Sequence, residues 1–225
     1  MSDPIVTERT RPALKRQNGP VPEWPFPIVL ASASPRRMEL LSRIVPEFAV
    51  DPARLDEAAL VARDPWQTAE NLSLAKALEV QPRHPGAVVI AGDTVVAYEE
   101  RPGCYVQLAK PVDAEDAARM LRTLSGRAHQ VITGVALATP WGREAFSVTS
   151  TVWFRPVSED EIRDYVRSGE PMDKAGAYAI QGGASRWVER LDGPVDNVIG
   201  LPVDELYARL DRLANYLASR SRNPD

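Results

Sequence analysis

The polar residues best suited to chemistry begin with Ser32-Ala33-Ser34-Pro35-Arg36-Arg37. Ser34 is a favourable helix N-cap and Pro35 a favourable first helical residue, so a helix is expected to start there. Free backbone N–H groups at a helix start attract anions, and arginine donor forks suit phosphate oxygens. The hexapeptide therefore indicates either a phosphate-binding site or a plain capped helix with two solvated arginines. Taken alone, it favours the plain helix.

Asp93 and Thr94 form the second candidate site. They follow the apolar run 87–91, which is typical of a buried strand, and Gly92 before them allows close approach of a ligand. A carboxylate in that position could hold Mg²⁺ or activate water. The alternative is an aspartate that satisfies backbone N–H groups of a turn, and for this residue alone the alternative is favoured. Thr94 is either an ordinary strand residue or a polar ligand contact.

Further charged and amide side chains could complete a binding site. Lys76 and Lys110 are either surface lysines or point charges for phosphate, and each alone favours the surface. Asp173 and Lys174, in a glycine-rich segment, either contact a small polar ligand or form an internal ion pair. Gln181 has both donors and acceptors and could read the edge of a base.

Alternating strand and helix patterns must position these residues. Strands are expected at 28–31, 48–50, 87–91, 95–98, 104–108, 130–138 and 145–154, and helices at 35–44, 64–80, 113–124, 158–167 and 202–217. The early alternation and the late hairpin predict an α/β fold with a mixed sheet. Residues 1–27 contain six prolines and predict a disordered tail, with the folded domain at 28–220.

The bulk composition argues against several classes of protein. The 225 residues carry a formal net charge of -4, whereas nucleic-acid binders are usually basic. Cys104 is the single cysteine, and the two histidines are far apart, so no multi-cysteine or histidine metal motif is present. No apolar run is long enough to span a membrane. We therefore expect a cytoplasmic protein without nucleic-acid or membrane partners, in which His129 packs structurally.

Taken together and in order, these segments resemble the Maf family of nucleoside triphosphate pyrophosphatases. The resemblance covers roughly residues 27–215. The matching motifs are Leu30 to Arg37, Gly92-Asp93-Thr94-Val95, Lys110-Pro111, Met120-Leu121 with Leu124-Ser125-Gly126, His129 through Val135, Asp173 through Gly182, and Gly193 with Asn197 through Pro202. Each motif is weak alone, but seven in this order are specific.

The resemblance implies an enzyme that hydrolyses the bond between the α and β phosphates of a nucleoside triphosphate. Products would be the monophosphate and pyrophosphate, and the cofactor a divalent cation, usually Mg²⁺. The implied fold is an elongated mixed β-sheet with flanking helices and two lobes around a cleft, of the Maf/ITPase-like type. Family members are often homodimers, and some are linked to arrest of septum formation.

The resemblance also assigns roles to individual residues. Asp93 matches the family's acidic proton acceptor, which we also expect to contact the metal. Either Asp56 or Glu57 matches a second acidic position, with the register left open. The expected substrate-binding residues are Ser32, Arg36, Arg37, Lys76, Thr94, Lys110, Asp173, Lys174 and Gln181. Among them, Arg36, Thr94 and Gln181 occupy the specificity positions and resemble the dTTP/UTP type.

Three departures from the family pattern concern the substrate more than the reaction. Ala109 and Ala179 stand where glycines are usual, and the segment after Gly193 lacks the common aromatic residue. Two alternatives to dTTP/UTP hydrolysis are therefore kept: the same reaction on 7-methyl-GTP or another modified nucleotide, and a nucleotide-binding regulator without useful turnover. A nucleic-acid-binding division regulator is disfavoured by the net charge.

Overall fold

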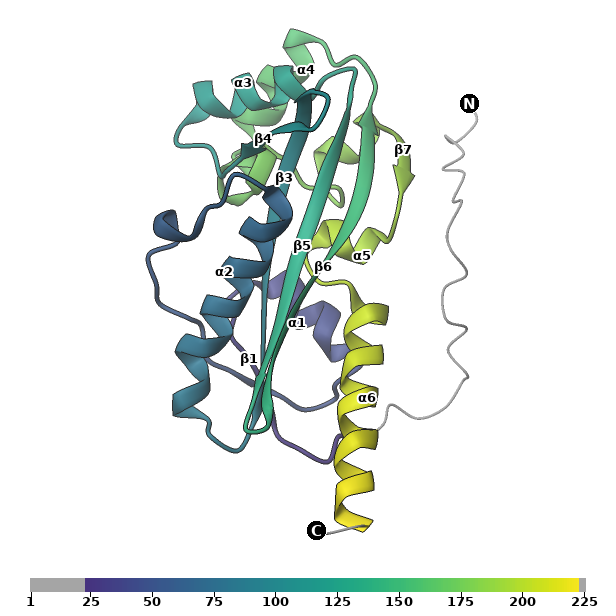
Figure 1. Ribbon diagram of the computed structural model, residues 1–225. Helices are drawn as coiled ribbons and strands as arrows, with labels where there is room; N and C mark the ends of the chain where they lie inside the picture. The colour runs from purple at the N-terminus through teal and green to yellow at the C-terminus, as the bar shows by residue number, and fades with distance from the viewer. Residues whose placement is uncertain (1–22, 223–225) are drawn as a thin grey trace, which may run out of the picture.

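One mixed β-sheet runs through the molecule, as a computed structural model describing residues 23–222 shows (Figure 1). Its strand order is β2-β1-β3-β5-β6-β7, with β4 also paired to β3. The strands are β1 Ile28–Leu30, β2 Ala49–Val50, β3 Val88–Arg101, β4 Cys104–Leu108, β5 Ala128–Thr139, β6 Gly142–Phe154 and β7 Val188–Asp192. Only β1 pairs in parallel, with β2 and β3, while the other pairs are antiparallel. The mixed α/β class is confirmed.

The helices begin where their capping residues indicate. They are α1 Pro35–Ser42, α2 Pro65–Val80, α3 Ala114–Leu124, α4 Glu159–Arg167, α5 Val195–Ile199 and α6 Val203–Arg222. Short 3-10 turns occur at Ala58–Leu60, Gln81–Arg83, Glu170–Asp173, Ala175–Ala177 and Gly183–Trp187. Side chains of Ser34, Asp64, Asp113 and Ser158 each accept a hydrogen bond from a backbone N–H in the first turn of their helix. Within residues 23–222, none of these helices has the length and apolar character needed to cross a membrane.

Two apolar cores give the molecule two lobes. Side chains of α1 and α6 pack with Val88 and Ile90 of β3 at one end of the sheet. Side chains of α3 and α4 pack with Val96 of the same strand at the other end. Successive strand residues alternate between faces, so these even-numbered positions place both cores on one face. Helix α2 covers the opposite face, where it packs on Val89 and Ala91.

The predicted tail reaches too far into the fold. Phe26 is only 6% exposed and belongs to the core with α1 and α6. The indole N–H of Trp24 donates to the carbonyl of Ile44 at 3.0 Å. The prediction of disorder is therefore wrong for residues 23–27, because Phe26 is buried and Trp24 packs, partly buried, against the same core. Residues 1–22 lie outside the described residues. Helix α6 ends at Arg222, five residues past its predicted end at 217 and two past the predicted domain end at 220.

Strand β3 does not break at Gly92-Asp93-Thr94, contrary to the sequence-based expectation. It runs without interruption because β5 pairs with it throughout, with Asp93 opposite Gly134 and Thr94 opposite Thr133. On its other edge, β1 pairs only as far as Ile90 and β4 only from Val96. Residues 91–95 therefore form a strand edge left open between β1 and β4, and Asp93 lies in its middle.

Candidate active site

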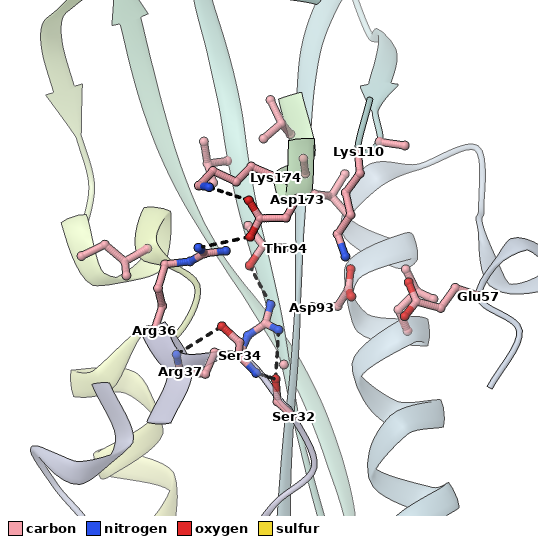
Figure 2. A pocket seen from close by; sticks show the side chains of 18 of the residues that line it. Ser32, Ser34, Arg36, Arg37, Glu57, Asp93, Thr94, Lys110, Asp173 and Lys174 are labelled. Atoms are coloured by element: carbon pink, nitrogen blue, oxygen red, sulfur yellow. Dashed lines mark hydrogen bonds and ion pairs between the residues drawn. The ribbon is translucent and has the colours of Figure 1, made fainter. Parts of the chain in front are cut away.

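A cavity of about 870 Å³ lies at this open edge of β3, between the two lobes. Figure 2 shows side chains converging on it from α1, α2, β3, the segment after β4 and the 3-10 turns near residue 173. All ten residues predicted to form the site line the cavity: Ser32, Arg36, Arg37, Lys76, Asp93, Thr94, Lys110, Asp173, Lys174 and Gln181. The structure brings these residues together, while their individual roles stay predictions.

Asp93, Lys76 and Glu57 form a charged group at one side of the cavity. The Lys76 ammonium lies 2.6 Å from Asp93 Oδ1 and 2.9 Å from Glu57 Oε1. The side chains of Lys76 and Asp93 are each only 14% exposed, so their attraction is screened less than that of a surface pair. The expectation of a surface position for Lys76 was therefore wrong.

The close packing of α2 on the sheet explains why Lys76 reaches β3. Gly134 of β5 lies directly under the helix, and a Cβ atom there would come within 2.1 Å of the Ala69 carbonyl oxygen. Ala69 and Ala77, both fully buried, keep the helix face small. A helix held this close carries Lys76 over the neighbouring strand, where it pairs with Asp93.

The structure resolves which of two adjacent acidic residues faces the cavity. Asp56 Oδ1 accepts a hydrogen bond from the backbone N–H of Ala58, at the start of a 3-10 turn. Glu57 instead lines the cavity and contacts Lys76. Glu57 is therefore the second acidic residue of the candidate site.

The Arg37 guanidinium donates most of its hydrogen bonds to other groups of the protein. Its Nε donates to the Gly200 carbonyl at 2.9 Å, Nη2 to Thr94 Oγ1 at 3.1 Å and Nη1 to Ser32 Oγ at 3.4 Å. Burial lowers the pKa of Arg37, and the negative charge of Asp93 opposes that shift. Since a guanidinium has five N–H bonds, about two stay available for a ligand. Arg37 thus joins α1, β3 and the segment after α5 in addition to any contact with phosphate.

Arg36 lies beside the turn that carries Asp173 and Lys174. Its Nη1 is 3.7 Å from Asp173 Oδ2, and Lys174 Nζ is 2.6 Å from Asp173 Oδ1. A hydrogen bond from Lys174 lowers the pKa of Asp173, with a smaller contribution from Arg36. The internal ion pair, one of two interpretations of Asp173-Lys174, is present. A ligand phosphate would compete with Asp173 for both cations.

Lys110 and Gln181 are exposed members of the cavity wall. Lys110 follows β4, and Figure 2 shows its side chain extended toward Asp93. Gln181 follows the 3-10 turn Ala175–Ala177 and lines the cavity with Tyr178 and Ile180. Both side chains are free to adjust to a ligand.

His129 is a packing residue, as the sequence indicated. It is 1% exposed, its Nε2 lies 2.8 Å from the Tyr178 hydroxyl, and its ring contacts Phe154 edge to face. Burial lowers the pKa of His129 to about 3, so the imidazole is neutral at ordinary pH. It supports Tyr178, which lines the cavity.

The donor groups fit a magnesium ion that enters with its ligand. In the part of the chain that the structure describes, no three His, Cys, Asp or Glu side chains are arranged as a metal site. Mg²⁺, however, is commonly held by one or two carboxylates together with substrate phosphates and water. Asp93 and Glu57 both contact the Lys76 ammonium, so their carboxylates lie close to each other. They could therefore supply the two carboxylates of such a magnesium site.

Sequence reasoning did not single out Thr133, which was quoted only as part of a longer motif. Its hydroxyl lies 3.0 Å from that of Thr94, the predicted specificity residue. Only the strand register places the two together, and register between β3 and β5 is a tertiary feature.

The chain is similar to known proteins over most of its length. Residues 27–213 match the family model described as Maf-like protein. A dTTP/UTP pyrophosphatase of Rhodospirillum rubrum is 50% identical over 82% of this chain and 86% of its own. That of Koribacter versatilis is 44% identical over 82% and 93%. The Staphylococcus aureus Ham1 protein structure is 16% identical over 83% of this chain and 98% of its own, with a TM-score of 0.45. The chain belongs to the Maf family.

Proposed function

We propose that this protein hydrolyses dTTP and UTP to the nucleoside monophosphate and pyrophosphate. The relatives named dTTP/UTP pyrophosphatase support this substrate, since they are 42–50% identical over most of the chain. The resemblance of Arg36, Thr94 and Gln181 to the dTTP/UTP type supports it further. The observation that carries the proposal is the Asp93–Lys76–Glu57 group, which faces a cavity lined by further cations.

The cations of the cavity suit a triphosphate. Such a ligand brings about four negative charges, which arginine forks and lysine ammonium groups can offset. Arg36 and Lys174 face it from one side and Lys110 from the other, near Asp93, with which Lys76 pairs. Binding would therefore draw the two lobes onto the same polyphosphate chain.

Asp93 is the proposed proton acceptor. Lys76 holds its Oδ1, and Oδ2 has no hydrogen-bond partner among residues 23–222. A water molecule bonded to Oδ2 would be oriented for attack on the α-phosphorus and would pass its proton to the carboxylate. Lys76 holds Asp93 in place through their 2.6 Å contact, while Arg36 and Lys110 offset charge on the leaving pyrophosphate.

Magnesium is the proposed cofactor. Asp93 and Glu57 would hold it jointly with phosphate oxygens, and the ion supplies charge neutralisation at the reacting phosphate. Chelation by EDTA is therefore expected to abolish turnover, and added Mg²⁺ to restore it.

A pyrophosphate-release assay tests the proposal. The panel is UTP, dTTP, CTP, GTP and 7-methyl-GTP with Mg²⁺, and Asp93→Asn is the control for contaminating activity. We expect UTP and dTTP to be hydrolysed fastest. Fastest release from 7-methyl-GTP would assign another substrate, and nucleotide binding without release above the control would indicate a regulator.

The homodimer and the cytoplasmic location that the family resemblance implies are also proposals. A homodimer predicts a sedimentation mass near twice the chain mass of 24.8 kDa. A cytoplasmic location predicts recovery of the protein in the soluble fraction of its own cells.

A further inference from the structure

A chain of hydrogen bonds runs behind Thr94. Arg37 Nη2 donates to Thr94 Oγ1 at 3.1 Å, and Thr94 Oγ1 lies 3.0 Å from Thr133 Oγ1. Thr133 Oγ1 in turn donates to the backbone carbonyl of Asn197 at 2.7 Å. Thr133 is completely buried, so it touches no ligand in the cavity and acts only through Thr94.

The direction of each bond in this chain is fixed by its ends. A carbonyl only accepts, so the single hydroxyl hydrogen of Thr133 is committed to Asn197. Thr94 must therefore donate its own hydrogen to Thr133. A guanidinium only donates, so Arg37 occupies one of the two lone pairs on Thr94. One lone pair is left, and the Thr94 hydroxyl can offer the cavity an acceptor but no donor.

Thr94 lies where Arg37 meets the apolar part of the cavity wall. Adjacent strand residues point to opposite faces, so Thr94 points away from the face of Asp93 and its charged partners. The register places Thr94 on the same face as Val131, which lines the cavity together with Val198 and Ile199. Apolar walls suit a nucleobase, whereas the charged side suits the polyphosphate. Thr94 is therefore placed to meet the base.

We propose that Thr133 is a positioning residue that presents Thr94 as an acceptor only, so that the cavity selects a base with an N–H at its pairing edge. Uracil and thymine carry such a hydrogen on N3, between two carbonyl groups. Cytosine has a lone pair on N3, which would face the lone pair of Thr94. Cytosine could donate a hydrogen bond to Thr94 only if the base shifted to bring its amino group next to the Thr94 oxygen. The inference rests on the proposed function and adds a basis for preferring UTP and dTTP over CTP.

Steady-state kinetics with UTP and CTP test this proposal on the wild type, Thr133→Val and Thr133→Ser. We expect kcat/KM of the wild type to be at least ~10-fold higher for UTP than for CTP. This is the scale expected when a substrate leaves a buried polar group without a hydrogen-bond partner. Thr133→Val releases the Thr94 hydrogen, so the hydroxyl can rotate to bond either base. The preference should then fall below about threefold. Thr133→Ser keeps the hydroxyl and should keep the preference, which a merely structural role would not predict.

Two results would overturn the inference: a wild type that hydrolyses CTP as well as UTP, or a folded Thr133→Val variant that keeps the full preference. Thermal unfolding shows whether the variants are folded. If Thr133→Val does not fold, Thr94→Val and Thr94→Ser replace it, with loss of preference expected only for Thr94→Val.

Calorimetric binding of the non-hydrolysable α,β-methylene analogues separates this inference from the proposed function. Tighter binding of the UTP analogue without any hydrolysis of UTP supports base selection and contradicts the enzymatic proposal. Hydrolysis of both nucleotides with equal binding of the two analogues contradicts base selection and supports the enzyme.

Discussion

At the scale of single residues, the charges of the cavity are balanced against one another in the structure. Lys76 contacts both Asp93 and Glu57, and Asp173 contacts both Lys174 and Arg36. A triphosphate would replace these internal contacts with its own, so its binding exchanges charge pairs instead of burying unpaired charges.

Replacing the proposed base tests the chemistry directly. Asp93→Asn keeps the size of the side chain but removes the proton acceptor and the charge that pairs with Lys76. We expect kcat to fall at least ~10²-fold, the scale of a positioned general base. Stopped pyrophosphate-release assays measure the rate, and circular dichroism checks the fold. Turnover near the wild-type rate in a folded variant would remove Asp93 from this role.

Two adjacent acidic residues give a matched pair of variants. Glu57→Gln removes the carboxylate that contacts Lys76, and we expect it to lower kcat/KM at least ~10-fold and raise the Mg²⁺ requirement. Asp56→Asn serves as the control and should stay within about twofold, because an amide oxygen still accepts the Ala58 N–H bond. Equal losses in both variants would contradict the assignment of Glu57.

The ten polar residues predicted for the site all line the cavity, but the sequence did not single out Thr68 and Gln107, which line it too, and could not describe the partners of any of them. The run Ser32 to Arg37 left open a phosphate site or solvated arginines, and the structure shows most of Arg37 engaged with Gly200, Thr94 and Ser32. Two of those three partners are distant in sequence. Burial of a guanidinium is decided by long-range packing, which local pattern does not contain.

At the scale of elements, the site depends on one strand that is longer than its neighbours. β3 extends past the end of β1 before β4 begins, and the open edge between them carries Asp93. Glycine, aspartate and threonine in a row are typical of a turn. Pairing with β5 overrides that local preference, which is why the predicted break at 92–94 is absent. Helix starts were predicted well because capping is local.

The contact between α2 and β5 predicts a strong effect at one glycine. A Cβ at Gly134 would overlap the Ala69 carbonyl oxygen, so Gly134→Ala must push α2 and Lys76 away from β3. We expect a loss of about 2 kcal/mol or more in unfolding free energy, together with reduced activity. Urea unfolding measures the stability.

Gly86→Ala is the matched control for this variant, because nothing lies within 4 Å of a Cβ at that position. Its stability should stay close to that of the wild type. A Gly134→Ala protein as stable and active as Gly86→Ala would show that the helix tolerates displacement.

At the scale of the whole molecule, two cores share three long strands, and the cavity lies between the cores (Figure 1). The sequence indicated two lobes only through the family resemblance, since periodicity does not tell which strand residues meet which helix. It also placed Trp24 and Phe26 in a tail, although both pack on the lobe formed by α1 and α6. The prediction of a tail relied on the proline content and gave too little weight to these two aromatic residues.

Burial of His129 predicts a pH dependence of stability. Its folded pKa of about 3 lies below the ordinary value of 6.5, so the unfolded chain binds a proton more readily than the folded protein. Stability should therefore fall as pH drops below 6.5, by about 1.4 kcal/mol per pH unit once the unfolded histidine is protonated. The window between pH 6 and 5 lies above the ordinary range of carboxylates. Burial raises the pKa of Asp196, which would act in the opposite direction, so the His129 contribution is obtained by comparison with a variant.

Urea unfolding at pH 6 and pH 5 measures this slope in the wild type and in His129→Gln. The glutamine does not titrate, so the variant, although less stable, should show a flatter dependence on pH. An equal slope in both proteins would mean that another group causes the acid sensitivity. Tyr178 and Phe154, which contact the ring, do not titrate in this range.

The most direct test of the proposed reaction is hydrolysis of UTP in H₂¹⁸O with mass-spectrometric analysis of the products. Water oriented by Asp93 toward the α-phosphorus should place one ¹⁸O atom in UMP and none in pyrophosphate, and Asp93→Asn should suppress the labelled product. Label in pyrophosphate or in orthophosphate, or unchanged labelling of UMP by a folded Asp93→Asn variant, would contradict the account.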